Sequence, residues 1–220
     1  MSGIIGFDKG DKGIISGGDL DYYRGKENRK DRIAIVWLFQ DDDGNYLMGD
    51  DDTPQFLAEE IHYIDGKGYI LDNEYLRDKL GPPKTKIGTF VVQYGTDRNG
   101  KMKEPFEYTV KPWTFGEDKF RDLKDIHQDF PLVKHDIKVV CKGEQYQKLN
   151  FTPTPQEAVW RRNDSIKKDI LETVKKLQKR LSIGREVPID ELKDHFGDSV
   201  DVSPDASAEV DFDSLIDGIE

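Results

Sequence analysis

The stretch Ile33-Ala34-Ile35-Val36-Trp37-Leu38-Phe39 is a continuous apolar run, rich in the β-branched and aromatic residues that are enriched in strands. Asp41-Asp42-Asp43-Gly44-Asn45 follows it as a turn. A short apolar run bounded by turn residues is typical of a buried strand. We therefore predict a buried strand over residues 33–39, within a β-rich domain.

Further strand-like runs follow in pairs. The run at residues 86–94 and the next one are joined through Asn99-Gly100, a strong hairpin signal. The expected pairs are residues 33–39 with 46–48, 56–64 with 69–71, 86–94 with 106–113, and 135–141 with 145–151.

An amphipathic helix is predicted between the third and fourth of these pairs. Residues 116–130 place Phe120, Leu123, Ile126, His127 and Phe130 on one helical face, and Pro131 ends the helix. Strands, one helix and then two more strands is the order of an OB-type barrel. The predicted fold class is α+β, mainly β: an OB-like barrel with insertions, an internal helix, a C-terminal helix and a disordered acidic tail.

The C-terminal helix is predicted to follow Thr152-Pro153-Thr154-Pro155, which breaks the β pattern. Thr154 would cap the helix and Pro155 would take its first position. An apolar stripe of Ile170, Val174, Leu177 and Leu181 has helical spacing. The stripe would pack on the domain itself, the favoured use, or on a second copy of the chain through self-association. Residues 161–185 also carry nine basic side chains against three acidic ones.

Charge divides the chain sharply. The formal net charge is −11, and residues 186–220 hold twelve acidic side chains against Lys193 alone, so 1 − 12 = −11. Residues 1–185 are therefore neutral overall, with 32 basic and 32 acidic side chains. Together with the strand pattern, this predicts a Gly-rich basic arm (residues 1–31), an OB-like domain (32–152), a basic helix (153–185) and an acidic flexible tail (186–220).

Several classes of protein are disfavoured by composition and motifs. No apolar run approaches the roughly 20 residues of a membrane span, and residues 1–9 lack the features of a secretory signal. The single cysteine, Cys141, suits a reducing compartment, so we expect a cytoplasmic protein. The nucleotide-binding Gly-x-x-x-x-Gly-Lys-Ser/Thr loop, the Gly-x-Ser-x-Gly nucleophile elbow and the His-Glu-x-x-His zinc helix are missing, so we expect neither an enzyme nor a cofactor.

Metal sites are not favoured by the sequence. His127, His135 and Cys141 would need a fourth ligand, and their spacing fits no standard zinc pattern. The runs at residues 41–43 and 50–52 lack the ordered spacing of a calcium loop, so exposed acidic loops are the preferred interpretation.

Aromatic and basic side chains interleave through the arm and the central strands. Single-stranded nucleic acid needs this mixture, because cations follow the phosphates while flat rings stack on bases. The same alternation of aromatic residues is also typical of any half-buried sheet, where the rings pack in the core. The candidate residues for binding single-stranded DNA are Tyr22, Tyr23, Arg24, Lys26, Arg29, Lys30, Lys84, Lys86, Phe90, Tyr94, Arg98, Lys101, Lys103, Tyr108, Lys111 and Trp113.

Apolar residues recur near the end of the acidic tail. Phe212, Leu215, Ile216 and Ile219 have spacings of three and four, which would put them on one side of a short helix in a partner's groove. With Asp211 and Asp213 they form the candidate partner-binding segment.

This layout resembles the single-stranded-DNA-binding proteins of replication, particularly phage-encoded ones, and Asp211-Phe212-Asp213 is similar to the acidic–aromatic tip of that family. The resemblance implies a non-enzymatic viral protein in the host cytoplasm that coats and protects single-stranded DNA. Its tail would recruit proteins of replication, recombination or repair.

Two other functions stay open at this point. The neutral balance of residues 1–185 is what an acidic adaptor or DNA mimic docking on a polymerase would show, since many DNA-binding proteins are plainly basic. A phage structural or assembly component is the other alternative.

Overall fold

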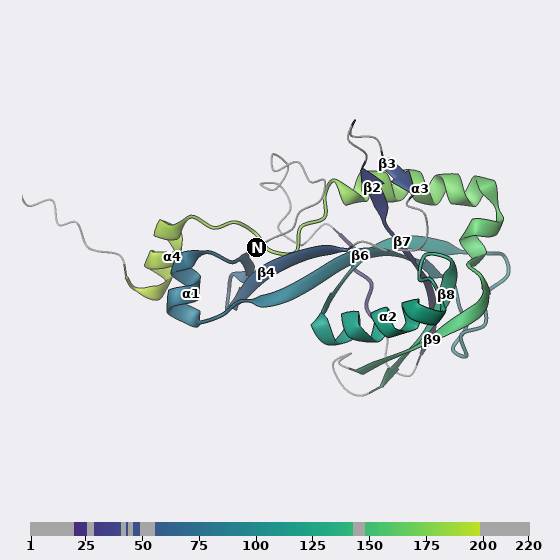
Figure 1. Ribbon diagram of the computed structural model, residues 1–220, viewed down its shortest axis with the longest axis horizontal. Coiled ribbons are helices and arrows are strands. Elements are labelled where there is room, and N and C mark those ends of the chain that lie inside the picture. Colours follow the sequence, from purple (N-terminus) through teal and green to yellow (C-terminus); the bar gives the residue numbers. More distant parts are fainter. Residues whose placement is uncertain are drawn as a thin grey trace, which may run out of the picture. The chain divides into compact units, whose positions relative to one another are not determined.

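The predicted apolar strand lies inside an antiparallel sheet. The computed structural model (Figure 1) describes residues 20–25, 29–40, 43, 46–48, 56–142 and 148–198. These residues form a mixed α+β fold made mainly of antiparallel sheet. They fall into two units, one within residues 1–186 and the other within residues 187–220.

The elements follow the chain in this order. The strands are β1 (Lys30–Val36), β2 (Leu38–Gln40), β3 (Tyr46–Met48), β4 (Leu57–Ile64), β5 (Gly68–Leu71), β6 (Lys84–Tyr94), β7 (Tyr108–Gly116), β8 (His135–Lys142) and β9 (Lys148–Glu157). The helices are α1 (Glu74–Leu80), α2 (Glu117–Asp129), the 3-10 helix η3 (Val159–Arg162), α3 (Asp164–Gln178) and α4 (Ile189–Phe196). Three of the expected hairpins are confirmed: β4 with β5, β6 with β7 and β8 with β9. The first is confirmed only in part, because the run at residues 33–39 is divided: β2 pairs with β3, whereas β1 pairs with β6 and β8. Helix α1 was not predicted, and α4 lies in the segment predicted as a flexible tail.

The main sheet is built around the long strand β6. Its order is β5-β4-β6-β1-β8-β9, and β7 pairs with the other edge of β6. Strands β1 and β4 share one edge of β6 end to end, because Val36 is opposite Phe90 and Leu57 is opposite Gly88. Among the described strands, no pairing joins β7 to β9, so the sheet is not closed.

Both faces of β1 are buried, which explains its unbroken apolar run. Ile33 and Ile35 pack with Leu123 of α2, whereas Ala34 and Val36 pack in a second cluster that includes residues of α3. The two helices lie on opposite sides of the sheet (Figure 1). A strand covered on both faces needs apolar side chains at every position, so it loses the usual alternation.

Helix α2 confirms its prediction. It ends at Asp129, before Pro131, and its Leu123 is fully buried while Phe120 and Ile126 pack against the same cluster. The start of the next helix was predicted wrongly. Residues 152–155 do not begin a helix; they continue β9, with Pro153 opposite Ile137. Proline lacks an N–H but is tolerated in a strand at the edge of a sheet.

Helix α3 begins later than predicted, at Asp164. The side chain of Asn163 caps it by accepting from the backbone N–H groups of Ser165 and Ile166. Its predicted stripe packs on the chain's own sheet, with Ile170 and Val174 fully buried. The end of the helix is fixed by Gln178, whose side chain exchanges two hydrogen bonds with the backbone of Leu38.

The second unit contains α4. The helix ends at Gly197, which adopts a positive φ of 74° and donates its N–H to the last-turn carbonyls. Glycine suits this position because a left-handed residue after a helix carries no Cβ penalty. None of the described helices has the length and apolar composition that a membrane span requires.

A polar network crosses the core on the α3 side. The buried carboxylate of Asp136 accepts from Arg32 Nε at 2.8 Å and from the Tyr94 hydroxyl at 2.9 Å. That hydroxyl accepts in turn from the backbone N–H of Trp160 at 3.2 Å. Burial raises the pKa of Asp136, while the Arg32 guanidinium and the Tyr94 hydroxyl oppose the rise. The network joins β1, β6 and β8 to η3.

Removing one hydroxyl tests this network. Tyr94→Phe leaves the buried N–H of Trp160 without its acceptor and takes a donor from Asp136. We expect the free energy of unfolding to fall by about 1–3 kcal/mol in urea denaturation. The matched control is Tyr63→Phe, which removes a hydroxyl from a ring that is 65 % exposed and should leave stability unchanged. Equal stability of the two variants would contradict the role given to Tyr94.

Candidate functional site

Most of the predicted stacking rings belong to the core. Tyr23, Phe90, Tyr94 and Trp113 are at most 3 % exposed. A ring enclosed in this way stabilises the domain and has no free face for a base. Tyr22 and Tyr108 are half-buried against the core on the α3 side. The Tyr108 hydroxyl donates to Asp169, and this hydrogen bond raises the pKa of Tyr108 to about 12.

The predicted basic residues of the arm and of the β6–β7 hairpin meet at one end of β6. Arg29 donates to the carbonyl of Thr96 at 3.1 Å and pairs with Asp31. Lys30 packs on Gly100, where any added Cβ would lie 2.9 Å from its side chain. Arg98 and Lys101 are exposed beside them.

The remaining predicted basic residues differ in their surroundings. Arg24 is exposed. Lys103 pairs with Glu107, and Lys111 pairs with Asp21. Lys26 lies outside the described residues, as do all the predicted partner-binding residues of the tail: Asp211, Phe212, Asp213, Leu215, Ile216 and Ile219.

The other end of β6 brings lysines and tyrosines onto one face of the sheet. Tyr63 of β4 is directly opposite Tyr69 of β5. In the neighbouring pairing, Ile61 is opposite Lys84 and Glu59 is opposite Lys86. Because alternate residues of a strand point to the same face, Tyr63, Tyr69, Lys84 and Lys86 share that face. We call these four residues the tyrosine–lysine cluster.

The rings of this cluster are open to solvent. Tyr63 is 65 % exposed and Tyr69 is 40 % exposed. Their ring centroids are 5.5 Å apart with the planes at 68°, an edge-on contact. The Lys86 ammonium lies 5.2 Å from the centroid of the Tyr69 ring, within the range of a cation–π interaction. Lys86 therefore covers part of the Tyr69 ring, whereas most of the Tyr63 ring stays exposed to solvent.

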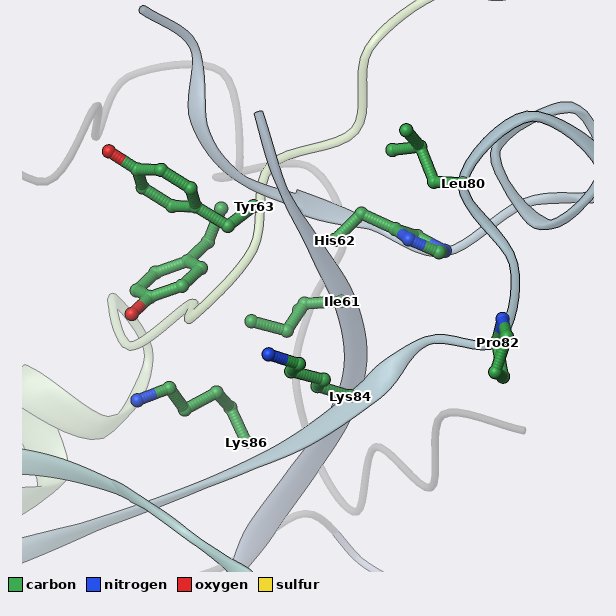
Figure 2. Close-up of a pocket in the computed structure, with 8 residues that line it drawn as sticks. Ile61, His62, Tyr63, Leu80, Pro82, Lys84 and Lys86 are labelled. Atoms are coloured by element: carbon green, nitrogen blue, oxygen red, sulfur yellow. The ribbon is translucent and has the colours of Figure 1, made fainter. Parts of the chain in front are cut away.

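A pocket of about 620 Å³ lies at the cluster (Figure 2). Besides the four cluster residues, it is lined by Ile61, His62, Leu80 and Pro82. Leu80 is 44 % exposed, so three of the large exposed apolar side chains in the described part of the chain border one pocket. Exposed apolar surface that gathers in this way is typical of an interaction site.

Charged groups hold helix α1, which supplies Leu80 to the pocket, against β4. The Nε2 atom of His62 is 2.8 Å from Oδ1 of Asp72, and the Arg77 guanidinium donates hydrogen bonds to the carboxylates of Asp72 and Glu60. Burial acts to raise the pKa of Asp72, but the hydrogen bonds from Arg77 and His62 outweigh it and hold the pKa below its ordinary value. Asn73 caps the helix by accepting from the N–H of Leu76. The part of the pocket lined by Leu80 and Pro82 is thus held in place relative to β4.

The chain after α3 covers the outer edge of β5. Arg185 donates its N–H to the carbonyl of Tyr69 at 3.1 Å and accepts from Leu71 at 2.9 Å. The buried carboxylate of Glu59 accepts from the N–H groups of Ile183 and Gly184. We call residues 183–185 the strap. A Cβ at Gly184 would lie 2.9 Å from Ile61, so the strap needs glycine there.

The side chains of the cluster are suited to binding a ligand. Exposed rings beside unburied ammonium groups can hold a flat, anionic ligand by stacking and charge. In the part of the chain that the structure describes, no three His, Cys, Asp or Glu side chains gather where they could hold a metal ion. Of the sixteen residues predicted for DNA binding, Lys84 and Lys86 belong to this cluster, whereas Tyr63 and Tyr69 were not predicted.

Comparison with known proteins assigns neither a family nor a fold to this chain. The chain matches no protein-family model, and the searches of curated proteins and of solved structures find no significant match.

The charge network behind the pocket predicts a dependence of stability on pH. A carboxyl with a lowered pKa in the folded state stabilises the protein above its unfolded pKa, and this contribution is lost as pH falls through the folded pKa. Asp72→Asn should therefore be less stable than the wild type at pH 7, and the difference should shrink on acidification to pH 3. Urea denaturation across this range measures it. Asp78→Asn, on the exposed side of α1, is the control; a constant difference for Asp72→Asn would contradict the pairing.

Proposed function

We propose that the protein binds single-stranded nucleic acid, and DNA in particular, through the tyrosine–lysine cluster. The observation that carries this proposal is the exposure of two neighbouring tyrosine rings beside Lys84 and Lys86 on one face of the sheet. Base stacking on such rings is indifferent to sequence, because every base has a flat face, and ammonium groups supply contacts to the phosphates.

The order of strand pairing supports an OB-type fold. In that fold, the first strand pairs with the second and the fourth, the second with the third, and the fourth with the fifth. Strands β1, β6, β7, β8 and β9 make these four kinds of pairing, and α2 lies between β7 and β8 in the chain. We propose that the domain is an OB variant in which the third and fifth strands, β7 and β9, do not pair with each other.

In this interpretation, the N-terminal arm lies in the gap between β7 and β9. Tyr23 donates its N–H to the carbonyl of Pro112 in β7 at 2.8 Å. Gly25 lies against Leu149 of β9 and Cys141 of β8, where an added Cβ would be 2.8 Å from Leu149. Residues 21–25 therefore contact both sides of the gap, and the barrel would be completed by the arm instead of by a direct pairing of β7 with β9.

The position of the cluster also fits an OB-type binding site. OB folds bind nucleic acid on the face of their second and third strands and with the connection between the first and second strands. Here the first and second strands would be β1 and β6. Tyr63 and Tyr69 lie in the connection between them, and Lys84 and Lys86 lie at the start of β6.

The proposed mechanism divides the work within the cluster. A base stacks on the free ring of Tyr63, and Tyr69 closes the edge of the site while it positions Lys86. Lys84 and Lys86 hold flanking phosphates and release counterions, so binding weakens with salt. The protein would coat and protect single strands without catalysing a reaction, and the segment from Glu186 to Glu220 would recruit replication or recombination proteins.

The function is tested by titrating labelled oligo-dT and a duplex of equal length. We expect a preference for the single strand and a steep loss of affinity with salt. Tyr63→Ala combined with Tyr69→Ala should weaken binding by about 5- to 150-fold, equivalent to 1–3 kcal/mol for a stacked base. The Tyr63→Phe, Tyr69→Phe double variant keeps both rings and should bind like the wild type. Equal affinity for the duplex, or full affinity of the alanine variant, would overturn the proposal.

The acidic segment gives a second test. With a net charge of −11, residues 186–220 would compete with DNA for the basic surface at high effective concentration. Deleting residues 202–220 should therefore tighten binding to single strands, with a gain that shrinks as salt screens the competition. Phe212→Ala combined with Ile216→Ala should leave DNA affinity nearly unchanged while it abolishes partner capture. Unchanged DNA affinity of the folded truncation at low salt would rule out the competition.

A further inference from the structure

The last turns of α3 carry an unbalanced positive charge. From Thr173 to Arg185, every charged side chain is basic, because the acidic residues of the helix all come earlier. Lys176, Lys179 and Arg180 are exposed, and none of them forms an ion pair within the described residues. We call these three residues the α3 basic end.

This basic end lies next to the tyrosine–lysine cluster. Along β6, Lys84, Lys86 and Gly88 alternate onto the same face. Leu181 and Ile183 pack on Gly88, within 3.5 Å of where its Cβ would be. The chain that leaves α3 therefore meets the sheet two residues beyond Lys86. Figure 1 shows this chain running from the end of α3 toward β4.

The turn that carries the charges is held in place. Gln178 is buried and donates to the carbonyl of Leu38 at 2.8 Å, and Arg180 donates its N–H to Leu177 at 2.9 Å. Leu181 is 3 % exposed. Lys179 and Arg180 thus lie between two anchored residues, so the backbone that carries them is fixed by the fold. Such a fixed turn costs less entropy on ligand binding than a mobile one.

Glu59 lies opposite Lys86 in the pairing of β4 with β6, but its carboxylate does not face solvent. It is 2 % exposed, and its carboxylate is occupied by the N–H groups of Ile183 and Gly184 in the strap. This carboxylate is therefore turned inward, toward the strap. The outer surface is left to Lys86 on one side and to the α3 basic end on the other.

We propose that the α3 basic end extends the nucleic-acid site, holding the phosphates of nucleotides beyond those that contact the tyrosine–lysine cluster. The ligand is then a single strand long enough to pass from the cluster over the junction with the strap to α3. This inference rests on the proposed function, and it assigns a role to a helix whose apolar stripe is fully used by packing on the sheet.

The test compares oligo-dT of two lengths, about 4 and about 16 nucleotides, which span the range of OB-type sites. Lys179→Gln combined with Arg180→Gln should weaken binding of the long oligomer. Its log–log salt dependence should flatten by about 1.4, or about 0.7 for each phosphate that the variant no longer neutralises. Binding of the short oligomer, which occupies the cluster alone, should stay unchanged.

The matched control is Lys119→Gln combined with Lys124→Gln on α2. This variant loses the same charge from the opposite side of the sheet and should bind both oligomers like the wild type. Equal effects of the two double variants would reduce the inference to bulk charge and overturn it. An unchanged salt slope with the long oligomer, or an equal loss with the short one, would also overturn it. Failure of the wild type to bind either oligomer would instead refute the proposed function.

Discussion

The buried carboxylate of Asp136 ties the centre of the sheet to η3, directly before α3. An ionised group in the core is costly unless it is paired and hydrogen-bonded, and here Arg32 and Tyr94 meet that demand. The Tyr94 hydroxyl then fixes Trp160 at the entrance to α3. The placement of the entrance to α3 against the sheet therefore depends on one charge being satisfied.

The exposure of the candidate site follows from the length of β6. Its C-terminal half pairs with β1 and lies between the clusters that α2 and α3 cover, so its rings are buried. Its N-terminal half pairs instead with β4, where Lys84 and Lys86 replace the apolar residues. One strand thus carries both the core and the surface that we assign to the ligand, and the change occurs near Gly88.

Local signals in the sequence predicted the elements well. The apolar run at residues 33–39, Asn99-Gly100 and Pro131 act over a few residues, so they identified β1, the β6–β7 hairpin and the end of α2. They could not show which rings are covered. Phe90 and Tyr63 are both aromatic residues in strands, yet only the packing of α3 decides that the first is buried. The pairing of Tyr63 with Tyr69 depends on register across the Asp65–Gly68 turn. The prediction that the β pattern ends near Pro153 was wrong, because a strand tolerates proline when it lies at the edge of a sheet, as β9 does.

The strap also sets a path for mechanical load. A pull on the chain at Arg185 would load its two hydrogen bonds with β5 before it reaches α3. The strap runs parallel to β5 at this point, and its two bonds are made with Tyr69 and Leu71, on either side of Ile70. Tension would therefore be borne first by the strand beneath an exposed tyrosine. Force applied at the strap would therefore act on the strand that carries part of the surface we propose for the ligand.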